Sequence, residues 1–438
     1  MAYLYRSIDD ELKKWSLSNE RKPLLLRGAR QVGKSSAVRN LGRDFKYFAE
    51  INFESDRGVH GFFEGNLEPF DICEKLSLYY GVPVRPNETL LFFDEIQACV
   101  PAISSLRYFY EKYPEIHLIA AGSLLEFALE ELPSFAVGRV RSMFMYPFSF
   151  NEYLKALGLD NLINAKQKAD YSMPLSQPIH NKLNDHLKKF LVLGGMPEVV
   201  SKYVSGSDIL ECMRTIDDIV ISYKSDFAKY KKRVNPLRMQ NVLLSAADQA
   251  GGRFVYSRAE KESSYRQIKE AIDLLIMAGL LIPVYRTSGN GIPLGAETDL
   301  SQFKIILIDT GVFQRILNLD ISDLFISDNW DMINKGSIAE QYAGLELIKA
   351  AGPYLQPSLY YWTKESRNSH AELDYLVQKG QSILPVEIKS GSKGSMKSML
   401  IYLEEKNQAF GIRSSTENFS QYQKVKVHPL YDLGRILK

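Results

Sequence analysis

The sequence is poor in cysteine, has no long apolar run and carries almost no net charge. Its three cysteines, Cys73, Cys99 and Cys212, lie far apart and form no CxxC pair. This spacing argues against a disulfide framework and a zinc site, and is typical of a reducing compartment. No run approaches the roughly 18 apolar residues of a membrane span, and the first residues contain no apolar signal segment. We therefore expect a cytoplasmic protein with no membrane contact.

The near-neutral charge limits what the whole molecule can attract. The formal net charge is +2 over 438 residues, so no molecule-wide basic field draws the protein onto nucleic acid. Any such contact must come from local patches. The hydrophobic fraction of 45% and the charged fraction of 24% are those of a soluble globular protein. A chain of this length has room for roughly two to four domains.

Residues 28–35 follow the pattern Gly-x-x-x-x-Gly-Lys-Ser, which is the most informative feature of the sequence. The apolar residues 24–26 predict a buried strand before the loop, and residues 37–41 have helical spacing after it. A loop at this position presents backbone N–H groups and a helix N-terminus to phosphate oxygens. The sequence therefore predicts that the chain binds ATP. The nine loop residues are Gly28, Ala29, Arg30, Gln31, Val32, Gly33, Lys34, Ser35 and Ser36.

Two acidic residues complete the predicted magnesium and water chemistry. Lys34 would contact the β- and γ-phosphates, and the Ser35 hydroxyl would bind Mg²⁺. A second apolar strand, residues 89–93, runs into Asp94 and Glu95. Asp94 would hold the same Mg²⁺, and Glu95 would polarise the water that attacks the γ-phosphate. A solvated strand end is the alternative explanation for these two acids.

A third strand, residues 116–121, ends just before Ser123. A polar side chain at this strand end can sense the γ-phosphate or orient the attacking water. Ser123 is therefore a candidate catalytic residue.

In this order and spacing, these elements resemble the AAA+ superfamily. More narrowly, they resemble a bacterial and archaeal family of AAA+ ATPases that carry a C-terminal domain of unknown function. The resemblance implies an α/β P-loop core followed by a small helical lid. It also implies that Arg139 approaches the γ-phosphate, in cis or from a neighbouring subunit of an oligomer; the alternative is a surface arginine that caps a loop. The segments that carry the resemblance are 27–35, 93–97, 121–125, 137–140, 146–154, 193–198 and 307–311.

The middle of the sequence resembles a winged helix. Residues 263–269 would open its recognition helix, with Arg266 and Lys269 facing a DNA groove. Several acidic neighbours make this region no more basic than average, so a purely packing role is the alternative. The densest basic run is 229–233, whose alternative is a solvated helix end. The predicted elements are a helix through 183–191 ended by Gly194, helices at 237–249 and 263–276, and strands at 280–285 and 303–308 around a glycine-rich loop at 288–295.

The C-terminal part resembles the PD-(D/E)xK nuclease-like core, with a helix that carries Glu340 and strands that carry Asp374 and the pair Glu387 and Lys389. The two-residue spacing puts Glu387 and Lys389 on one face of a strand. Asp374 and Glu387 would then share a divalent cation, Lys389 would orient a water, and Glu340 would support the metal site. The alternative is a packed sheet whose charged edge is a structural ion-pair network.

We therefore expect an α/β protein with four parts. They are an AAA+ P-loop core at 1–145, a helical lid and connector at 146–232, a winged-helix-like domain at 233–310 and a restriction-endonuclease-like domain at 311–438. The predicted function is Mg²⁺-dependent ATP hydrolysis that acts on or with DNA. One alternative is an ATP-dependent switch or scaffold that binds a protein partner and has an inert C-terminal domain. Another is a DNA-binding regulator without cleavage.

Overall fold

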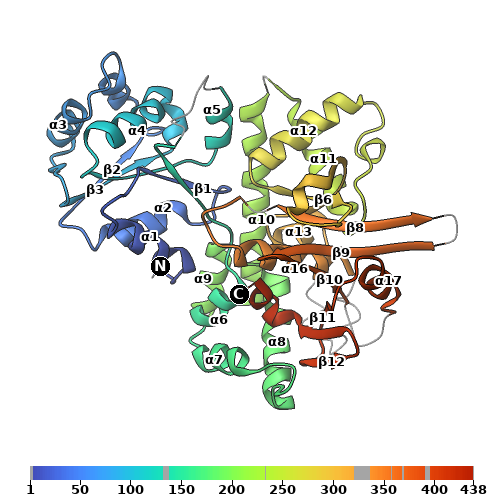
Figure 1. Cartoon of the computed structure of the whole chain (residues 1–438). Helices are drawn as coiled ribbons and strands as arrows, with labels where there is room; N and C mark the ends of the chain where they lie inside the picture. Colours follow the sequence, from blue (N-terminus) through green and yellow to red (C-terminus); the bar gives the residue numbers. More distant parts are fainter. Residues whose placement is uncertain are drawn as a thin grey trace. The chain divides into compact units, whose positions relative to one another are not determined.

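Figure 1 shows the computed structural model, which describes residues 3–131, 138–231, 233–319, 336–356, 358–366, 369–389 and 395–437. The chain forms two compact units. The first contains Met1–Tyr146, with Met277–Gly279 and Pro353–Gln356; the second contains Pro147–Ile276, Leu280–Gly352 and Pro357–Lys438. The boundary predicted after residue 145 lies beside this division. No helix in the described ranges combines the length and hydropathy that a membrane span requires.

The first unit is built on a parallel sheet in the order β2-β3-β4-β1-β5. Its inner strands are apolar along most of their length, as expected where helices cover both faces of a parallel sheet. Because β4 lies between β1 and β3, the residues that follow β4 lie between the phosphate loop and the acidic end of β3. The strands are β1 (Leu24–Arg27), β2 (Tyr47–Asn52), β3 (Thr89–Asp94), β4 (His117–Ala121) and β5 (Arg141–Phe144).

The helices of this unit pack on the sheet through alternate residues of its strands. On one face, Leu25, Leu91 and Leu118 share an apolar core with side chains of α3 and α4. The phosphate loop leads into α2, which packs on β3 and β4. The helices are α1 (Ser7–Ser16), α2 (Lys34–Gly42), η1 (Arg57–Phe63), α3 (Pro69–Tyr80), η2 (Ile96–Ala98), α4 (Val100–Lys112) and α5 (Leu125–Glu131).

The second unit begins with the helices expected of the lid and connector. The predicted break is present, since α8 ends at Leu193 and is capped by Gly194, whose φ of 72° few other residues adopt. Ser149 caps α6: its Oγ accepts from the Glu152 amide, and its own amide donates to the Glu152 carboxylate at 2.7 Å. The helices are α6 (Phe150–Ala156), α7 (Asp160–Lys168), α8 (Gln177–Leu193), α9 (Pro197–Val204), α10 (Ile209–Asp226), η3 (Phe227–Tyr230) and α13 (Thr310–Ile316).

The described strands of the second unit form one sheet in the order β12-β13-β11-β10-β9-β8-β6-β7. The predicted winged-helix hairpin is β6 and β7, and β6 pairs in parallel with β8. The hairpin therefore extends the sheet predicted for the nuclease-like domain, and the structure does not separate 233–310 from 311–438. A hairpin alone is marginally stable and has unpaired edges, which pairing with β8 reduces. The strands are β6 (Leu281–Thr287), β7 (Thr298–Leu307), β8 (Leu359–Ser366), β9 (Ser369–Lys379), β10 (Ser382–Ile388), β11 (Gly411–Ser415), β12 (Ser420–Tyr422) and β13 (Val425–Pro429).

Helices of the second unit pack on this sheet. The helix α16 packs against β7, β10 and η6, and α17 packs against β9. The two helices predicted for the winged helix are present as α11 and α12. The helices are α11 (Pro236–Asp248), η4 (Tyr256–Arg258), α12 (Tyr265–Met277), η5 (Leu294–Glu297), α16 (Gly336–Ala350), α17 (Lys397–Glu405) and η6 (Leu430–Leu437).

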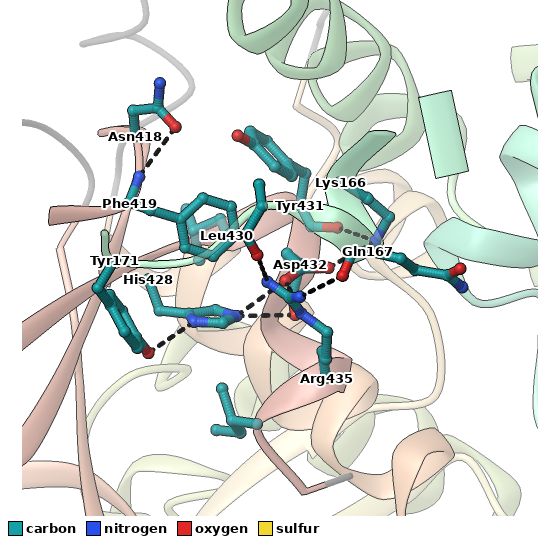
Figure 2. A network of polar contacts seen from close by, with 12 residues as sticks. Lys166, Gln167, Tyr171, Asn418, Phe419, His428, Leu430, Tyr431, Asp432 and Arg435 are labelled. Atoms are coloured by element: carbon teal, nitrogen blue, oxygen red, sulfur yellow. Dashed lines mark hydrogen bonds and ion pairs between the residues drawn. The ribbon is translucent and has the colours of Figure 1, made fainter. Parts of the chain in front are cut away.

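A buried polar network connects α7 to η6 within the second unit (Figure 2). The Lys166 ammonium lies 3.1 Å from Asp432 Oδ1 and donates to the Tyr431 carbonyl at 3.0 Å. The other carboxylate oxygen of Asp432 accepts from Arg435 Nε at 2.6 Å and lies 3.2 Å from His428 Nε2. Burial would raise the pKa of Asp432, but the hydrogen bond from His428 and the charges of Lys166 and Arg435 outweigh it and hold the pKa below its ordinary value.

We expect Lys166→Met to destabilise the second unit by about 3 kcal/mol, because it removes one partner of a buried ion pair. The matched control is Lys202→Met, whose partner Glu211 lies 3.3 Å away at a partly exposed site; its loss should stay below about 1 kcal/mol. Chemical denaturation of the two full-length variants measures both values. Equal losses of stability in the two variants would contradict the larger effect that we expect at the buried Lys166 pair.

Candidate ATP site and C-terminal acid cluster

The phosphate loop adopts a backbone conformation that positions Lys34 at the start of α2. Gly28, Gln31 and Gly33 have φ values of 141°, 65° and 98°. A Cβ at Gly28 would lie 2.2 Å from the Met145 carbonyl oxygen, so only glycine fits there. Lys34 Nζ donates to the carbonyls of Gly28 and Ala29, each at 2.8 Å, so the loop folds around the ammonium.

The Lys34 ammonium is buried without a carboxylate partner. The residue is 7% exposed, and among the described residues its Nζ makes no ion pair. Burial lowers the pKa of Lys34 to about 8, although Glu95 and Asp94 oppose this shift from a distance. A buried cation with only carbonyl oxygens around it is favourably placed to receive an anion such as a phosphate group.

The residues predicted to hold Mg²⁺ come together at the end of β3. Ser35 Oγ donates to both carboxylate oxygens of Asp94 at 3.1 Å, and Asn52 Nδ2 lies 3.4 Å from Asp94 Oδ2. Burial raises the pKa of Asp94, and the nearby Glu95 raises it further, so a cation here would relieve an unfavourable charge. One hydroxyl and one carboxylate suit Mg²⁺, which keeps several waters and shares phosphate oxygens. The donor set therefore fits the predicted magnesium site.

Glu95 is held by hydrogen bonds from two neighbouring elements. Its Oε2 accepts from Gln97 Nε2 at 2.7 Å and from the amide and hydroxyl of Ser123, each at 3.1 Å. Burial would raise the pKa of Glu95, but these donors and Lys34 outweigh it, so the pKa lies below its ordinary value. Glu95 is thus kept as a carboxylate, the form that can accept a proton from water.

Gln97 is a site residue that the sequence analysis did not select. A Cβ at Gly122 would lie 1.8 Å from Gln97 Oε1, so the glycine before Ser123 leaves room for Gln97. The signal in the sequence is the glutamine two residues after Glu95, together with the glycine that ends the third strand.

Arg139 lies near the amino-terminal ends of the parallel strands, whereas the phosphate loop lies at their carboxyl-terminal ends. It precedes β5, whose first residue, Arg141, is aligned with Leu24 at the start of β1. The loop follows the other end of β1, about 10 Å further along the strand. The Arg139 guanidinium pairs with Glu111 of α4. This placement does not fit approach in cis, so only the approach from a neighbouring subunit remains a proposal. Val137 of the same motif lies outside the described residues.

Three of the predicted residues of the C-terminal site lie on α16, β9 and β10, and Lys389, expected on the strand, directly follows the last residue of β10. Lys389 Nζ lies 2.5 Å from Glu387 Oε1, and Asp374 Oδ2 accepts from the Ile388 amide at 2.7 Å. Burial raises the pKa of Glu340, although a neighbouring lysine ammonium opposes this shift. Burial and the charge of Asp374 raise the pKa of Glu387 to about 7. The second oxygen of Glu387 is buried without a hydrogen-bond partner.

A lysine that the sequence analysis did not select lies among these acids. Lys304 of β7 is 2% exposed, and its Nζ lies 2.9 Å from Glu340 Oε1 and 3.7 Å from Asp374 Oδ1. Glu372, also not selected, lies 2.5 Å from the same ammonium. Burial would lower the pKa of Lys304, but the three carboxylates outweigh it and raise the pKa above its ordinary value.

The C-terminal residues do not fit the predicted metal site. Among the residues that the structure describes, no group of three His, Cys, Asp or Glu side chains could hold a metal ion. The carboxylates of Glu340 and Asp374 instead face an ammonium. The ion-pair network that was the alternative for this cluster is what the contacts form.

The predicted DNA-contacting residues lie on the exposed first turns of α12. Arg266 and Lys269 are exposed, and neither makes an ion pair or hydrogen bond with the described residues. Tyr265 beside them is 57% exposed. Of the basic run at 229–233, Lys229 lies 3.2 Å from Asp226, and Lys232 lies outside the described part of the chain.

Comparison with known families agrees with the geometry of the first unit. Residues 20–154 match the family described as "AAA domain". This match supports an AAA-type P-loop ATPase domain in the first unit. Residues 184–323 and 335–433 match two families described as domains of unknown function, DUF8612 and DUF4143. The chain matches none of the curated proteins.

The solved structures that are similar to the chain include the following two. The Walker-type ATPase paby2304 of Pyrococcus abyssi is 16% identical, with a TM-score of 0.48, over 72% of this chain and 96% of that one. The ORC1 protein of Aeropyrum pernix in complex with DNA is 14% identical, with a TM-score of 0.28, over 74% of this chain and 94% of that one. At these scores neither similarity supports an argument about the function of this chain.

The lowered pKa of Lys34 predicts that nucleotide affinity depends on pH. Below a pH of about 8 the free protein holds Lys34 charged, and above it the ammonium loses its proton. We therefore expect the Kd for ATP to rise by up to about tenfold per pH unit above 8. Titration calorimetry from pH 7 to 9.5 measures this change, together with proton uptake near pH 8. A Kd that stays constant through pH 9 would contradict the buried, unpaired state of Lys34.

Proposed function

We propose that the chain hydrolyses ATP with Mg²⁺ at the site formed by residues 28–36, Asp94, Glu95 and Ser123. Lys34 binds the β- and γ-phosphates, and Ser35 and Asp94 hold Mg²⁺, which offsets charge on the phosphates when it is bound. Glu95 accepts a proton from the attacking water, and Ser123 and Gln97 keep its carboxylate in place. The observation that supports this proposal most is the contrast between a buried Lys34 without an anion and an adjacent Glu95 held ionised by three donors.

Two substitutions separate nucleotide binding from turnover. Lys34→Ala should weaken ATP binding by at least about tenfold, because a charge-assisted contact to phosphate is lost. Glu95→Gln keeps size and hydrogen bonding but cannot accept a proton, so we expect similar affinity and turnover lowered by about 100-fold or more. Fluorescence titration with a labelled ATP analogue and release of inorganic phosphate measure the two effects.

The control for this pair is Glu11→Gln, which removes an acid of the same unit that pairs with Lys14 at its surface. It should change neither affinity nor turnover. Unchanged hydrolysis in Lys34→Ala or Glu95→Gln would overturn the assignment of the ATP site.

A contact with DNA through α12 is the second candidate function. It is favoured by the free, exposed side chains of Arg266 and Lys269 and by the adjacent exposed aromatic ring of Tyr265. Cations that lack acidic partners can neutralise phosphates, and an aromatic ring can stack on a base. An ATP-dependent switch that binds a protein partner through this surface is the alternative.

The double substitution Arg266→Ala/Lys269→Ala tests the DNA contact. If both side chains neutralise phosphates, the slope of log Kobs against log[salt] should fall by about 2. The control Lys75→Ala/Lys182→Ala removes the same charge from exposed positions elsewhere. Fluorescence anisotropy with duplex DNA at several salt concentrations measures the slopes. Equal slopes in wild type and both double variants, or no DNA binding at all, would favour the protein partner.

A further inference from the structure

The acid cluster of the second unit contains its own cation. Lys304 Nζ approaches three carboxylates, those of Glu340, Glu372 and Asp374, at 2.9, 2.5 and 3.7 Å. These acids come from α16 and β9, whereas the lysine comes from β7. The ammonium also lies 5.4 Å from the centroid of the Tyr361 ring. One buried side chain therefore connects three elements that are far apart in the sequence.

A divalent cation would need the same oxygen atoms. Carboxylate oxygens are the ligands that Mg²⁺ and Mn²⁺ prefer. A divalent cation beside Glu387 would therefore use the carboxylates of Glu340 and Asp374. Both carboxylates direct an oxygen at Lys304 Nζ. A metal ion bound to those oxygens would lie beside a buried ammonium, and the two positive charges would repel each other in a medium of low dielectric constant.

The ammonium cannot easily leave the cluster. Lys304 is 2% exposed, so withdrawal of its Nζ would bury a charge without its partners, or require β7 to move. Pairing with carboxylates is the ordinary way in which a protein accommodates a buried charge. Lys304 pairs with three carboxylates, and Lys389 pairs with one oxygen of Glu387. Among the described residues, the second oxygen of Glu387 has no hydrogen-bond partner.

We propose that Lys304 is the permanent cation of this cluster and takes the place that a divalent metal ion would occupy between Glu340 and Asp374. The C-terminal site of this chain then binds no Mg²⁺ or Mn²⁺ and performs no metal-dependent cleavage. Removal of the lysine side chain should leave an anionic cavity that accepts a divalent cation. This inference concerns the second unit alone and does not rest on the proposed ATP hydrolysis.

The experiment is Mn²⁺ binding to nucleotide-free, full-length protein, measured by electron paramagnetic resonance. The proteins compared are wild type, Lys304→Ala, Asp374→Asn, Lys304→Ala/Asp374→Asn and the control Lys166→Ala. Lys166 is an equally buried lysine of the same unit, but its ion-pair partner is the single acid Asp432. We expect Lys304→Ala to gain one Mn²⁺ per chain, with affinity at least tenfold above wild type. The double variant and Lys166→Ala should bind Mn²⁺ as wild type does.

Two results would overturn the proposal. One is a folded Lys304→Ala that gains no Mn²⁺, and the other is a wild-type Mn²⁺ site that Asp374→Asn removes. The second comparison does not need Lys304→Ala to fold, since the proposal requires wild type and Asp374→Asn to bind Mn²⁺ equally. The melting temperature gives an independent readout, because Mn²⁺ should raise it in Lys304→Ala only.

Discussion

The burial of a lysine ammonium is the constraint on which both charged sites of this protein depend. Lys34 and Lys304 are both almost fully buried, and burial alone lowers the pKa of each. Among the residues that the structure describes, Lys34 has only backbone carbonyls as direct partners, and its pKa stays below the ordinary value. Lys304 has three carboxylates, and its pKa rises above the ordinary value. The same desolvation therefore has different consequences at the two sites. Lys34 is placed to bind an anion, whereas carboxylates already compensate the charge of Lys304.

The parallel sheet explains how the first of these sites is assembled. The loop after β1, the acids that end β3 and the serine that follows β4 all lie at the carboxyl edge of adjacent strands. Because β4 lies between β1 and β3, Ser123 can hydrogen-bond Glu95 while Ser35 reaches Asp94. Polar side chains that are far apart in the sequence therefore lie close together at the strand ends, while the buried strands themselves remain apolar.

The sequence analysis selected residues that the structure brings together here, because they belong to short motifs at the ends of apolar strands. The acids at 94 and 95 directly follow a continuous apolar run, which marks the end of a buried strand. The C-terminal cluster was harder to predict, because the sequence of the strand that carries Lys304 is equally typical of the second strand in a winged-helix hairpin. Only the pairing of β6 with β8 puts this strand in the same sheet as Asp374. No local pattern encodes a pairing between strands so distant, or the pairing of Arg139 with Glu111.

The most direct test of the account is the number of Mn²⁺ ions bound per wild-type chain, with and without a non-hydrolysable ATP analogue. The account predicts one Mn²⁺ when the analogue is bound, lost in Asp94→Asn and retained in Asp374→Asn. It predicts no tight site without the analogue. A second Mn²⁺ that Asp374→Asn removes would contradict the account, because Lys304 could not then be the cation of the C-terminal cluster.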